Sequence, residues 1–316
     1  MAGERVLIPF ADLAEVAGPE WPFGLDVDVW DGTGDPPRDL DGVAFYAPPY
    51  GSDVGYAVLD ELLARPDLRV VQSLRAGVDE LVGVVPADRI LANGRGLHDA
   101  STAEQAIGLI LAAQRELPRW VEAQSRGVWD PEFVGSLADR RVLLVGAGSI
   151  GGAIARRLVP FETELTLVAR RARPAERVLS VQDLDGLLPR TEIVILVLPD
   201  GDETRGILDA RRLALLPDGA LVVNVGRGPA IDTDALVAEL RSGRLRAALD
   251  VVDPEPLPPG HPLWTTPGTI ITPHVGGGST SFAPRARQLL VDQLRRFAAG
   301  EPLANVVEER TAGNGA

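Results

Sequence analysis

The sequence contains no cysteine and no lysine, and only three histidines. Without cysteine the chain forms no disulfide, thiolate nucleophile or cysteine-ligated zinc site. All 31 basic residues are arginines, so a lysine Schiff base and the phosphate loop that depends on a lysine are also excluded. His98, His261 and His274 offer little for a metal site built from several histidines, and we expect no metal.

Positive charge and long hydrophobic runs are also scarce. The 31 arginines against 45 acidic residues give a formal net charge of −14, and the field of such a protein repels a nucleic acid or an anionic membrane surface. The apolar stretch 193–199 falls well short of the ~20 residues that span a bilayer, and the start of the chain has no signal-peptide pattern. We therefore expect a cytoplasmic protein that binds neither nucleic acid nor a membrane.

The chain is long enough for two domains, since 316 residues compare with a prior of about 150 per domain. Short apolar runs alternate with helical patterns along it, which predicts an α/β fold with parallel sheets buried on both faces. Strands are expected at 5–10, 27–30, 43–47, 68–74, 90–92, 141–145, 165–169, 192–198, 220–225, 247–251 and 269–272. Helices are expected at 55–64, 100–114, 151–158, 234–242 and 285–299.

A glycine-rich turn follows the predicted strand at 141–145. Gly146, Gly148 and Gly151 form a G-x-G-x-x-G pattern between this strand and a helix. Such glycines allow a tight turn and the close approach of a pyrophosphate to the helix N-terminus, so the unit predicts dinucleotide binding. The alternative is a turn that only packs the helix against the strand.

The next strand indicates which dinucleotide is bound. NAD sites place an acidic residue at the end of this strand, but here ELTLVA runs into Arg170, Arg171 and Arg173. A guanidinium can bind phosphate oxygens in two places, so this cluster favours the 2′-phosphate of NADP. The alternative is a solvated basic turn in an arginine-rich protein.

Three later segments carry a family resemblance: VNVGRG at 223–228, ALDVVDPEPL at 248–257 and ITPHVG at 271–276. Together with the glycine turn, their order and spacing resemble the D-2-hydroxyacid dehydrogenase family across most of the chain. The segments QSLRAGVD, STAE and AGEPLANVV support the match. Each segment alone is weak evidence, whereas the set is highly specific.

The resemblance implies a catalytic set of three residues. Reduction of a 2-keto acid needs a proton donor, and His274 matches the acid/base of the family. Glu255 matches the carboxylate that favours its imidazolium form and orients the ring, and Arg227 matches the cation that holds the substrate. Alternatively, His274 is a structural histidine hydrogen-bonded to the backbone, and Glu255 and Arg227 are ordinary solvent-exposed residues. His98 and His261 are interpreted as structural.

The resemblance also implies binding residues. At the pyrophosphate it places Ser149 and Ile150, beside the glycines Gly146, Gly148 and Gly151. Arg170 and Arg171 are assigned to the 2′-phosphate from the arginine cluster itself. Further along the cofactor the resemblance places Leu198, Pro199, Thr204, Val225 and Gly226, with Asp250 near the nicotinamide carboxamide. The substrate-binding residues implied are Arg75, Ala76 and Gly77, together with Tyr46 in the loop YAPPYG.

Departures from the family pattern refine these expectations. Members that use NAD carry an aspartate where this chain has Ala169 and Arg170, so NADP is expected as the preferred cofactor, with NAD possible. Formate dehydrogenases of the superfamily place glutamine where this chain has Glu255, which argues against formate. The chain ends soon after its last predicted helix, so we expect no regulatory domain like that of long phosphoglycerate dehydrogenases.

The implied fold is two Rossmann-like domains. A doubly wound, parallel-sheet dinucleotide-binding domain (98–282) is inserted into a discontinuous, flavodoxin-like substrate domain (1–97, then 283–316 with the C-terminal helix and tail). The active site is expected in the cleft between them, and the protein is expected to be a homodimer.

The expected function is that of an NADPH-preferring oxidoreductase acting on a small 2-keto or 2-hydroxy acid of the glyoxylate or hydroxypyruvate type. One alternative is a binding module, like the relatives that act as dinucleotide-sensing corepressors. It would bind cofactor without turnover. The other is an NAD-dependent 3-phosphoglycerate dehydrogenase, which would need cationic partners for the substrate phosphate.

Overall fold

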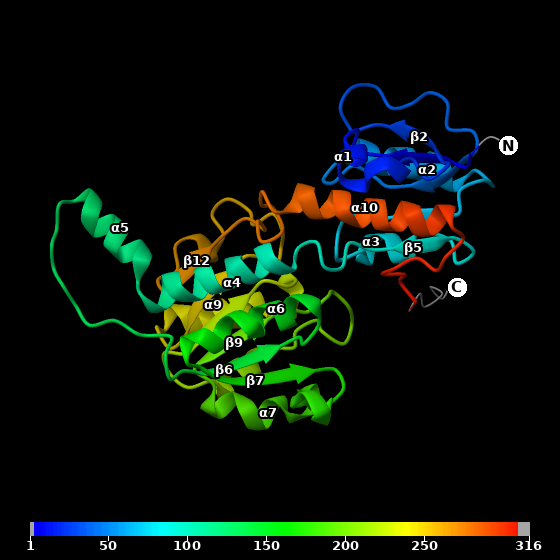
Figure 1. Cartoon of the computed structure of the whole chain (residues 1–316). Helices are drawn as coiled ribbons and strands as arrows, with labels where there is room; N and C mark the ends of the chain where they lie inside the picture. Colours follow the sequence, from blue (N-terminus) through cyan, green and yellow to red (C-terminus); the bar gives the residue numbers. More distant parts are fainter. Residues whose placement is uncertain (1–2, 309–316) are drawn as a thin grey trace. The chain divides into compact units, whose positions relative to one another are not determined.

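The computed structural model describes residues 3–308, which form two compact units (Figure 1). Unit 1 is the chain up to His98 and from Thr280 onward, and unit 2 runs from Asp99 to Ser279. The last part of the expected substrate domain, residues 309–316, lies outside the described residues. Within the described part, no helix has the length and apolar character needed to cross a membrane.

Unit 1 is built on a parallel sheet of five strands in the order β2-β1-β3-β4-β5. The strands are β1 (Arg5–Ile8), β2 (Asp26–Val29), β3 (Val43–Tyr46), β4 (Val70–Gln72) and β5 (Ile90–Ala92). The α-helices are α1 (Leu13–Ala17), α2 (Asp53–Leu63), α3 (Asp79–Val82) and α10 (Phe282–Ala298). This 2-1-3-4-5 order is that of flavodoxin-like folds, as expected.

Both faces of this sheet are covered. Along β1, Leu7 packs into a cluster with Val58, Leu59 and Leu62 of α2, while its neighbours Val6 and Ile8 pack into the cluster of α10. Successive strand residues point to opposite faces, so a strand buried on both sides has to be apolar throughout. The continuous apolar run at the start of the chain follows from this requirement.

Unit 2 is a parallel sheet of seven strands in the order β12-β11-β10-β9-β6-β7-β8. The strands are β6 (Arg141–Val145), β7 (Glu164–Ala169), β8 (Val178–Ser180), β9 (Ile193–Leu196), β10 (Leu221–Asn224), β11 (Arg246–Leu249) and β12 (Thr269–Ile271). The α-helices are α4 (Asp99–Gln114), α5 (Leu117–Ser125), α6 (Ser149–Leu158), α7 (Leu184–Leu187), α8 (Ala210–Leu215) and α9 (Thr233–Arg241). Helices lie on both sides of the sheet (Figure 1), which confirms the doubly wound α/β prediction.

The order of the strands determines where a ligand can bind. From β6 the chain winds outward to β7 and β8, and it then returns to place β9 on the other side of β6. In open α/β sheets the crevice at such a reversal, at the carboxyl ends of the strands, is where ligands bind. In unit 2 this crevice lies where β6 and β9 end, and the glycine turn begins there.

Candidate active site

The predicted catalytic residues follow three neighbouring strands of unit 2. Arg227 comes after β10, Glu255 lies in the loop after β11, and His274 comes after β12. Because all three strands are parallel neighbours, their carboxyl ends meet at one edge of the sheet. The predicted cofactor residues follow β6, β7, β9, β10 and β11 on the same edge. One edge of one sheet therefore carries both sets.

His274 and Glu255 are in direct contact. The imidazole Nδ1 lies 2.5 Å from Glu255 Oε1, and both side chains keep roughly half of their surface exposed, at 46% and 40%. This contact occupies Nδ1, so Nε2 is the ring nitrogen that remains for a substrate. The pair has the composition of a general acid/base oriented by a carboxylate.

Arg227 is half-buried and has an extended backbone, with φ −134° and ψ 140°. Its position is fixed by Asn224, a fully buried residue that the sequence did not single out. The Asn224 amide donates to the Arg227 carbonyl at 2.8 Å and accepts from the Gly226 N–H at 3.0 Å. The side chain of Asn224 thus holds the turn that presents the arginine.

The three glycines of the glycine turn have different surroundings. A Cβ on Gly146, which has φ +116°, would lie 2.3 Å from the Val197 carbonyl oxygen, and one on Gly151 would lie 1.8 Å from that of Gly146. The packing of the chain itself therefore requires glycine at both positions. A Cβ on Gly148 would meet nothing within 4 Å, so this glycine lines open space at the start of α6. The residues therefore fit a pyrophosphate approaching at Gly148.

The predicted pyrophosphate residue Ser149 already has a side-chain partner. Its hydroxyl donates a short hydrogen bond to Asp99 Oδ2 in the first turn of α4, leaving the backbone N–H of Ser149 as the group for a phosphate. The other carboxylate oxygen, Asp99 Oδ1, is buried and has no hydrogen-bond partner among the described residues. No sequence signal links these two residues, which lie 50 positions apart. Ile150, the next predicted residue, packs against the core between α4 and α6.

The arginine cluster follows β7, and Arg173 in it contacts the glycine turn. Arg173 Nη2 donates to the Ala147 carbonyl oxygen at 2.8 Å. Arg170 and Arg171, the two arginines predicted for the 2′-phosphate, are exposed on the same loop, and Arg170 Nη1 lies 3.7 Å from Glu203 Oε2. The sequence indicated the cluster but not that Arg173 joins it to the turn.

The remaining predicted cofactor residues pack at the ends of β9 and β10. A Cβ on Gly226 would lie 2.5 Å from the Leu198 nitrogen, so the two loops approach as closely as backbone permits. Thr204 Oγ1 donates to the Pro199 carbonyl at 2.8 Å and closes the loop after β9. Val225 is buried, and its N–H donates to the Leu196 carbonyl at 3.0 Å.

Asp250 is also buried, only 2% exposed, at the end of β11. Its side chain accepts hydrogen bonds from two backbone N–H groups of the loop that carries His274, Val275 at 3.1 Å and Gly276 at 2.8 Å. The Asp250 side chain therefore holds the backbone immediately after His274.

The predicted substrate residues lie in unit 1. Arg75 pairs with Glu80 at 3.0 Å, and its guanidinium carbon lies 5.3 Å from the centre of the Tyr56 ring. Ala76 and Gly77, which follow it, are partly exposed. Tyr46 is fully buried, its hydroxyl donates to the Gly55 carbonyl at 3.0 Å, and burial raises the pKa of this hydroxyl.

Because it is buried, the Tyr46 side chain is not placed to contact a substrate, and a substrate contact stays predicted only for the other residues of the loop YAPPYG.

His98 and His261, the two histidines outside the predicted catalytic set, make backbone contacts. His98 Nε2 lies 3.1 Å from the Leu74 carbonyl oxygen, and His261 Nδ1 accepts from the Leu263 N–H at 3.3 Å. Within residues 3–308, no group of three or more histidine, aspartate or glutamate side chains could hold a metal ion.

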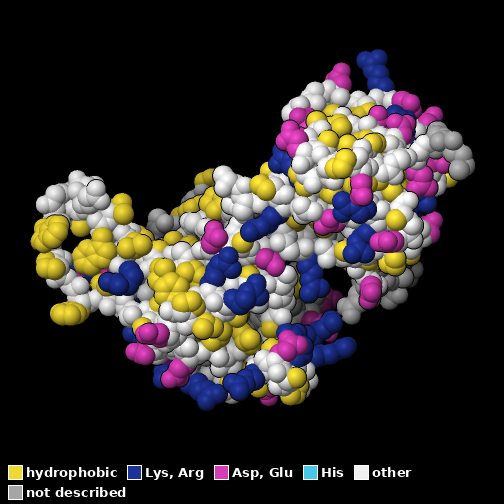
Figure 2. Space-filling model, viewed as in Figure 1, with side chains coloured by type: hydrophobic (Ala, Val, Ile, Leu, Met, Phe, Trp, Pro, Cys, Tyr) yellow, Lys and Arg dark blue, Asp and Glu magenta, His cyan; other side chains and the backbone are white. Residues whose placement is uncertain are grey.

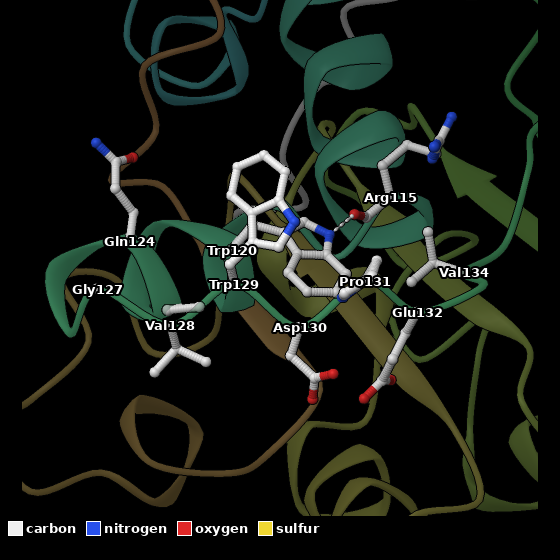
Figure 3. A pocket seen from close by; sticks show the side chains of 11 residues that line it. Arg115, Trp120, Gln124, Gly127, Val128, Trp129, Asp130, Pro131, Glu132 and Val134 are labelled. Carbon is white, nitrogen blue, oxygen red and sulfur yellow. Dashed lines mark hydrogen bonds between the residues drawn. The ribbon is translucent and has the colours of Figure 1, made fainter.

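Unit 2 also carries an apolar arm, which is α5 and the segment 126–134 that returns from it (Figure 1). Arg119 on α5 donates to Glu132 on the returning segment at 2.7 Å and ties the two together. A groove of about 660 Å³ lies between them and includes Trp120 and Trp129 in its lining (Figure 3). Hydrophobic side chains gather over this arm (Figure 2), with Trp129 95% exposed and Phe133 fully exposed.

A doubly wound sheet with a glycine turn at its strand reversal, and a histidine–glutamate pair on the same edge, has the architecture of a dinucleotide-binding oxidoreductase. Residues 107–276 match the family model described as D-isomer specific 2-hydroxyacid dehydrogenase, NAD binding domain. The glyoxylate reductase of Aeropyrum pernix is 32% identical over 304 residues, which are 89% of this chain and 89% of that protein. This chain belongs to the D-isomer specific 2-hydroxyacid dehydrogenase family and is an oxidoreductase.

Solved structures agree with this assignment. A D-isomer specific 2-hydroxyacid dehydrogenase from Xanthobacter autotrophicus Py2, in complex with NADPH and MES, has a TM-score of 0.80 at 32% identity and covers 98% of this chain and 99% of its own. An NADPH-dependent glyoxylate/hydroxypyruvate reductase from Sinorhizobium meliloti, in complex with NADP and sulfate, has a TM-score of 0.78 at 28% identity, covering 96% and 98%. The D-3-phosphoglycerate dehydrogenase of Methanocaldococcus jannaschii is 31% identical over 76% of this chain, but only 47% of that longer protein is covered.

Proposed function

We propose that the protein is an NADPH-preferring reductase of small 2-keto acids, of the glyoxylate or hydroxypyruvate type. The contact between His274 and Glu255, at the strand ends beside the loop of Arg227, is the observation that carries this proposal. The similarity to NADPH-dependent reductases of these acids supports the choice of substrate and cofactor.

The residues divide the chemistry between them. NADPH, when bound at the glycine turn, supplies the hydride. His274 donates a proton from Nε2 to the carbonyl oxygen of the substrate, and Glu255 stabilises the imidazolium and keeps the ring in place. Arg227 holds the substrate carboxylate and polarises the carbonyl group. The loop from Arg75 to Gly77 in unit 1 stays the predicted source of backbone amides for the substrate carboxylate.

A reductase assay tests the substrate proposal. Glyoxylate, hydroxypyruvate, pyruvate, phenylpyruvate and 3-phosphohydroxypyruvate would each be offered with NADPH and with NADH, and the loss of reduced-nicotinamide absorbance would be followed. We expect the highest kcat/KM for glyoxylate or hydroxypyruvate with NADPH. A preference for the phosphorylated acid with NADH would support the phosphoglycerate dehydrogenase alternative. Cofactor binding without turnover of any acid would favour a sensing module.

The preference for NADPH is assigned to Arg170 and Arg171. Replacing both with alanine should raise the Kd of NADPH by at least tenfold, since a single hydrogen bond to a charged group is worth about 1.5–3 kcal/mol and about 1.4 kcal/mol is tenfold in Kd. The Kd of NADH should change less than about twofold, because NADH has no 2′-phosphate for them to bind. Arg211→Ala is the matched control, because it removes an exposed arginine from α8. Equal losses for both cofactors would contradict the assignment, and fluorescence titration measures each Kd.

We further propose that the protein is a homodimer whose interface includes the arm. Exposed aromatic side chains on a projecting element are typical of surfaces that associate. A second copy would cover them symmetrically, because a two-fold interface places the same patch on both subunits.

A further inference from the structure

Asp250 accepts several of the hydrogen bonds that hold the loop carrying His274, and the His274 N–H also lies 3.0 Å from the Thr272 carbonyl oxygen. The His274 N–H donates to the Asp250 carbonyl oxygen at 2.8 Å, the Val275 N–H to Asp250 Oδ1 at 3.1 Å, and the Gly276 N–H to Asp250 Oδ2 at 2.8 Å. Three consecutive backbone donors therefore end on one buried residue. A Cβ on Gly276 would lie 2.9 Å from Asp250 Oδ2, so the fit leaves no room for a side chain there.

His274 needs this support because its backbone is strained. Its φ of +52° is in the left-handed region, which a residue with a side chain adopts at a cost. Such a conformation persists only where the surroundings fix it. The same conformation aims the ring at Glu255, so whatever fixes the backbone also fixes the contact between the two side chains.

Two more side chains complete the arrangement. Thr272 Oγ1 donates to Asp250 Oδ1 at 2.5 Å and accepts from Gln105 Nε2 at 2.9 Å. Gln105 lies on α4, and its amide nitrogen is 3.5 Å from Asp250 Oδ1. The hydroxyl of Thr272 thus connects the helix that covers the sheet to the carboxylate that holds the loop.

We propose that Thr272 and Gln105 are positioning residues that act through Asp250 to hold the imidazole of His274 against Glu255. This inference rests on the proposed function, because it gives the network a role in proton donation. It also limits the predicted cofactor contact of Asp250. A carboxylate has about four acceptor sites. Thr272 and Val275 donate to Asp250 Oδ1 and Gly276 donates to Oδ2, so one acceptor site remains, on Oδ2. A nicotinamide carboxamide could therefore bind Asp250 only through the acceptor site that the loop leaves unused.

The test compares three variants of two threonines. Thr272→Val removes the donor and keeps the branched shape, Thr272→Ser restores the hydroxyl, and Thr191→Val is the matched control. Thr191 is buried, whereas Thr272 is partly buried. The Thr191 hydroxyl likewise donates to an oxygen, the Leu187 carbonyl at 2.9 Å, but Thr191 precedes β9 at the opposite edge of the sheet. We measure kcat and KM with the best 2-keto acid, the Kd of NADPH, and the ring-proton NMR signals of His274, assigned with His274→Ala.

Relative to Thr191→Val, we expect Thr272→Val to lower kcat by roughly tenfold or more, because small misplacements of a reacting group cost up to about a hundredfold. The Kd of NADPH should stay within about twofold, and Thr272→Ser should recover most of the rate, because its hydroxyl can still donate to Asp250. The His274 ring signals should move in Thr272→Val and not in the other two variants.

Three results would overturn the proposal: unmoved ring signals in Thr272→Val, a kcat equal to that of Thr191→Val, or a loss of rate matched by a loss of NADPH affinity. If the unmodified protein reduces no acid in the panel, the proposed function fails. The ring signals of Thr272→Val then still decide whether the network positions His274.

Discussion

The imidazole of His274 is occupied on one side, because its Nδ1 lies 2.5 Å from Glu255 Oε1. This leaves Nε2 for the substrate, and a proton donor with one free nitrogen has a defined direction of transfer. Asn224 and Asp250 have similar roles, since each is a buried polar residue that fixes the backbone beside a proposed catalytic side chain, Arg227 and His274 respectively. At this scale the candidate site consists of exposed or half-buried side chains beside buried hydrogen-bonding groups that hold their backbone.

Replacing His274 with alanine should therefore lower kcat by about 10²–10⁴-fold, the range that general acid catalysis supplies. The Kd of NADPH should hardly change, because the glycine turn lies after β6 and does not include this residue. Steady-state kinetics and fluorescence titration give the two numbers. His261→Ala serves as the control, since this partly buried histidine caps a short turn through its ring nitrogen. Turnover that survives in His274→Ala would remove the residue from the acid/base role.

Among the elements of unit 2, the glycine turn between β6 and α6 combines two requirements. Gly146 and Gly151 are needed by the protein's own packing, whereas Gly148 faces open space. The backbone of Gly148, with φ −84°, is one that alanine can adopt. The two kinds of glycine can thus be separated by substitution.

Gly148→Ala should fold with nearly unchanged stability and bind NADPH at least tenfold more weakly, because its methyl group occupies the space where a pyrophosphate would approach. Gly151→Ala should instead lower the free energy of unfolding by about 1–3 kcal/mol or more, because its methyl group overlaps the Gly146 carbonyl. Urea unfolding and NADPH titration of both variants check this. If Gly148→Ala keeps full NADPH affinity, the cofactor does not approach at this glycine.

At the scale of the whole molecule, the packing of a single chain does not explain why the arm exposes aromatic side chains. Trp129 and Phe133 are almost fully exposed beside a groove that contains a second tryptophan, and contact with water is unfavourable for such side chains. An association that buries them would remove this cost.

The change Trp129→Ala with Phe133→Ser should convert a dimer into a monomer of 33.6 kDa without unfolding unit 2, because neither side chain belongs to the buried core. Sedimentation velocity measures the mass, and circular dichroism checks the fold. Val159→Ser, which alters another exposed apolar residue of unit 2, should leave the dimer intact. A variant of the arm that remains dimeric would place the interface elsewhere, and a monomeric unmodified protein would contradict the proposed homodimer.

Local signals were sufficient for much of the fold and part of the site. The apolar runs predicted all strands except β8, which has only three residues, because strands buried on both faces must be apolar throughout. The helix α5 was missed although Pro118 stands in its first turn, where proline is favoured, because its exposed apolar residues form no face toward a core. The family motifs predicted His274, Glu255, Arg227 and the glycine turn as the site, and the structure places them at one edge of one sheet.

The sequence by itself determined the composition of the site: which side chains could transfer a proton, hold a carboxylate or make room for a phosphate. Tertiary structure alone decided how they are held, because hydrogen bonds between distant residues leave no periodic trace in the chain. Gln105 and Asp250 lie 145 positions apart, and Ser149 and Asp99 lie 50 apart, yet each pair meets across the sheet edge. Strand order decides such meetings, since it places the ends of β10, β11 and β12 side by side.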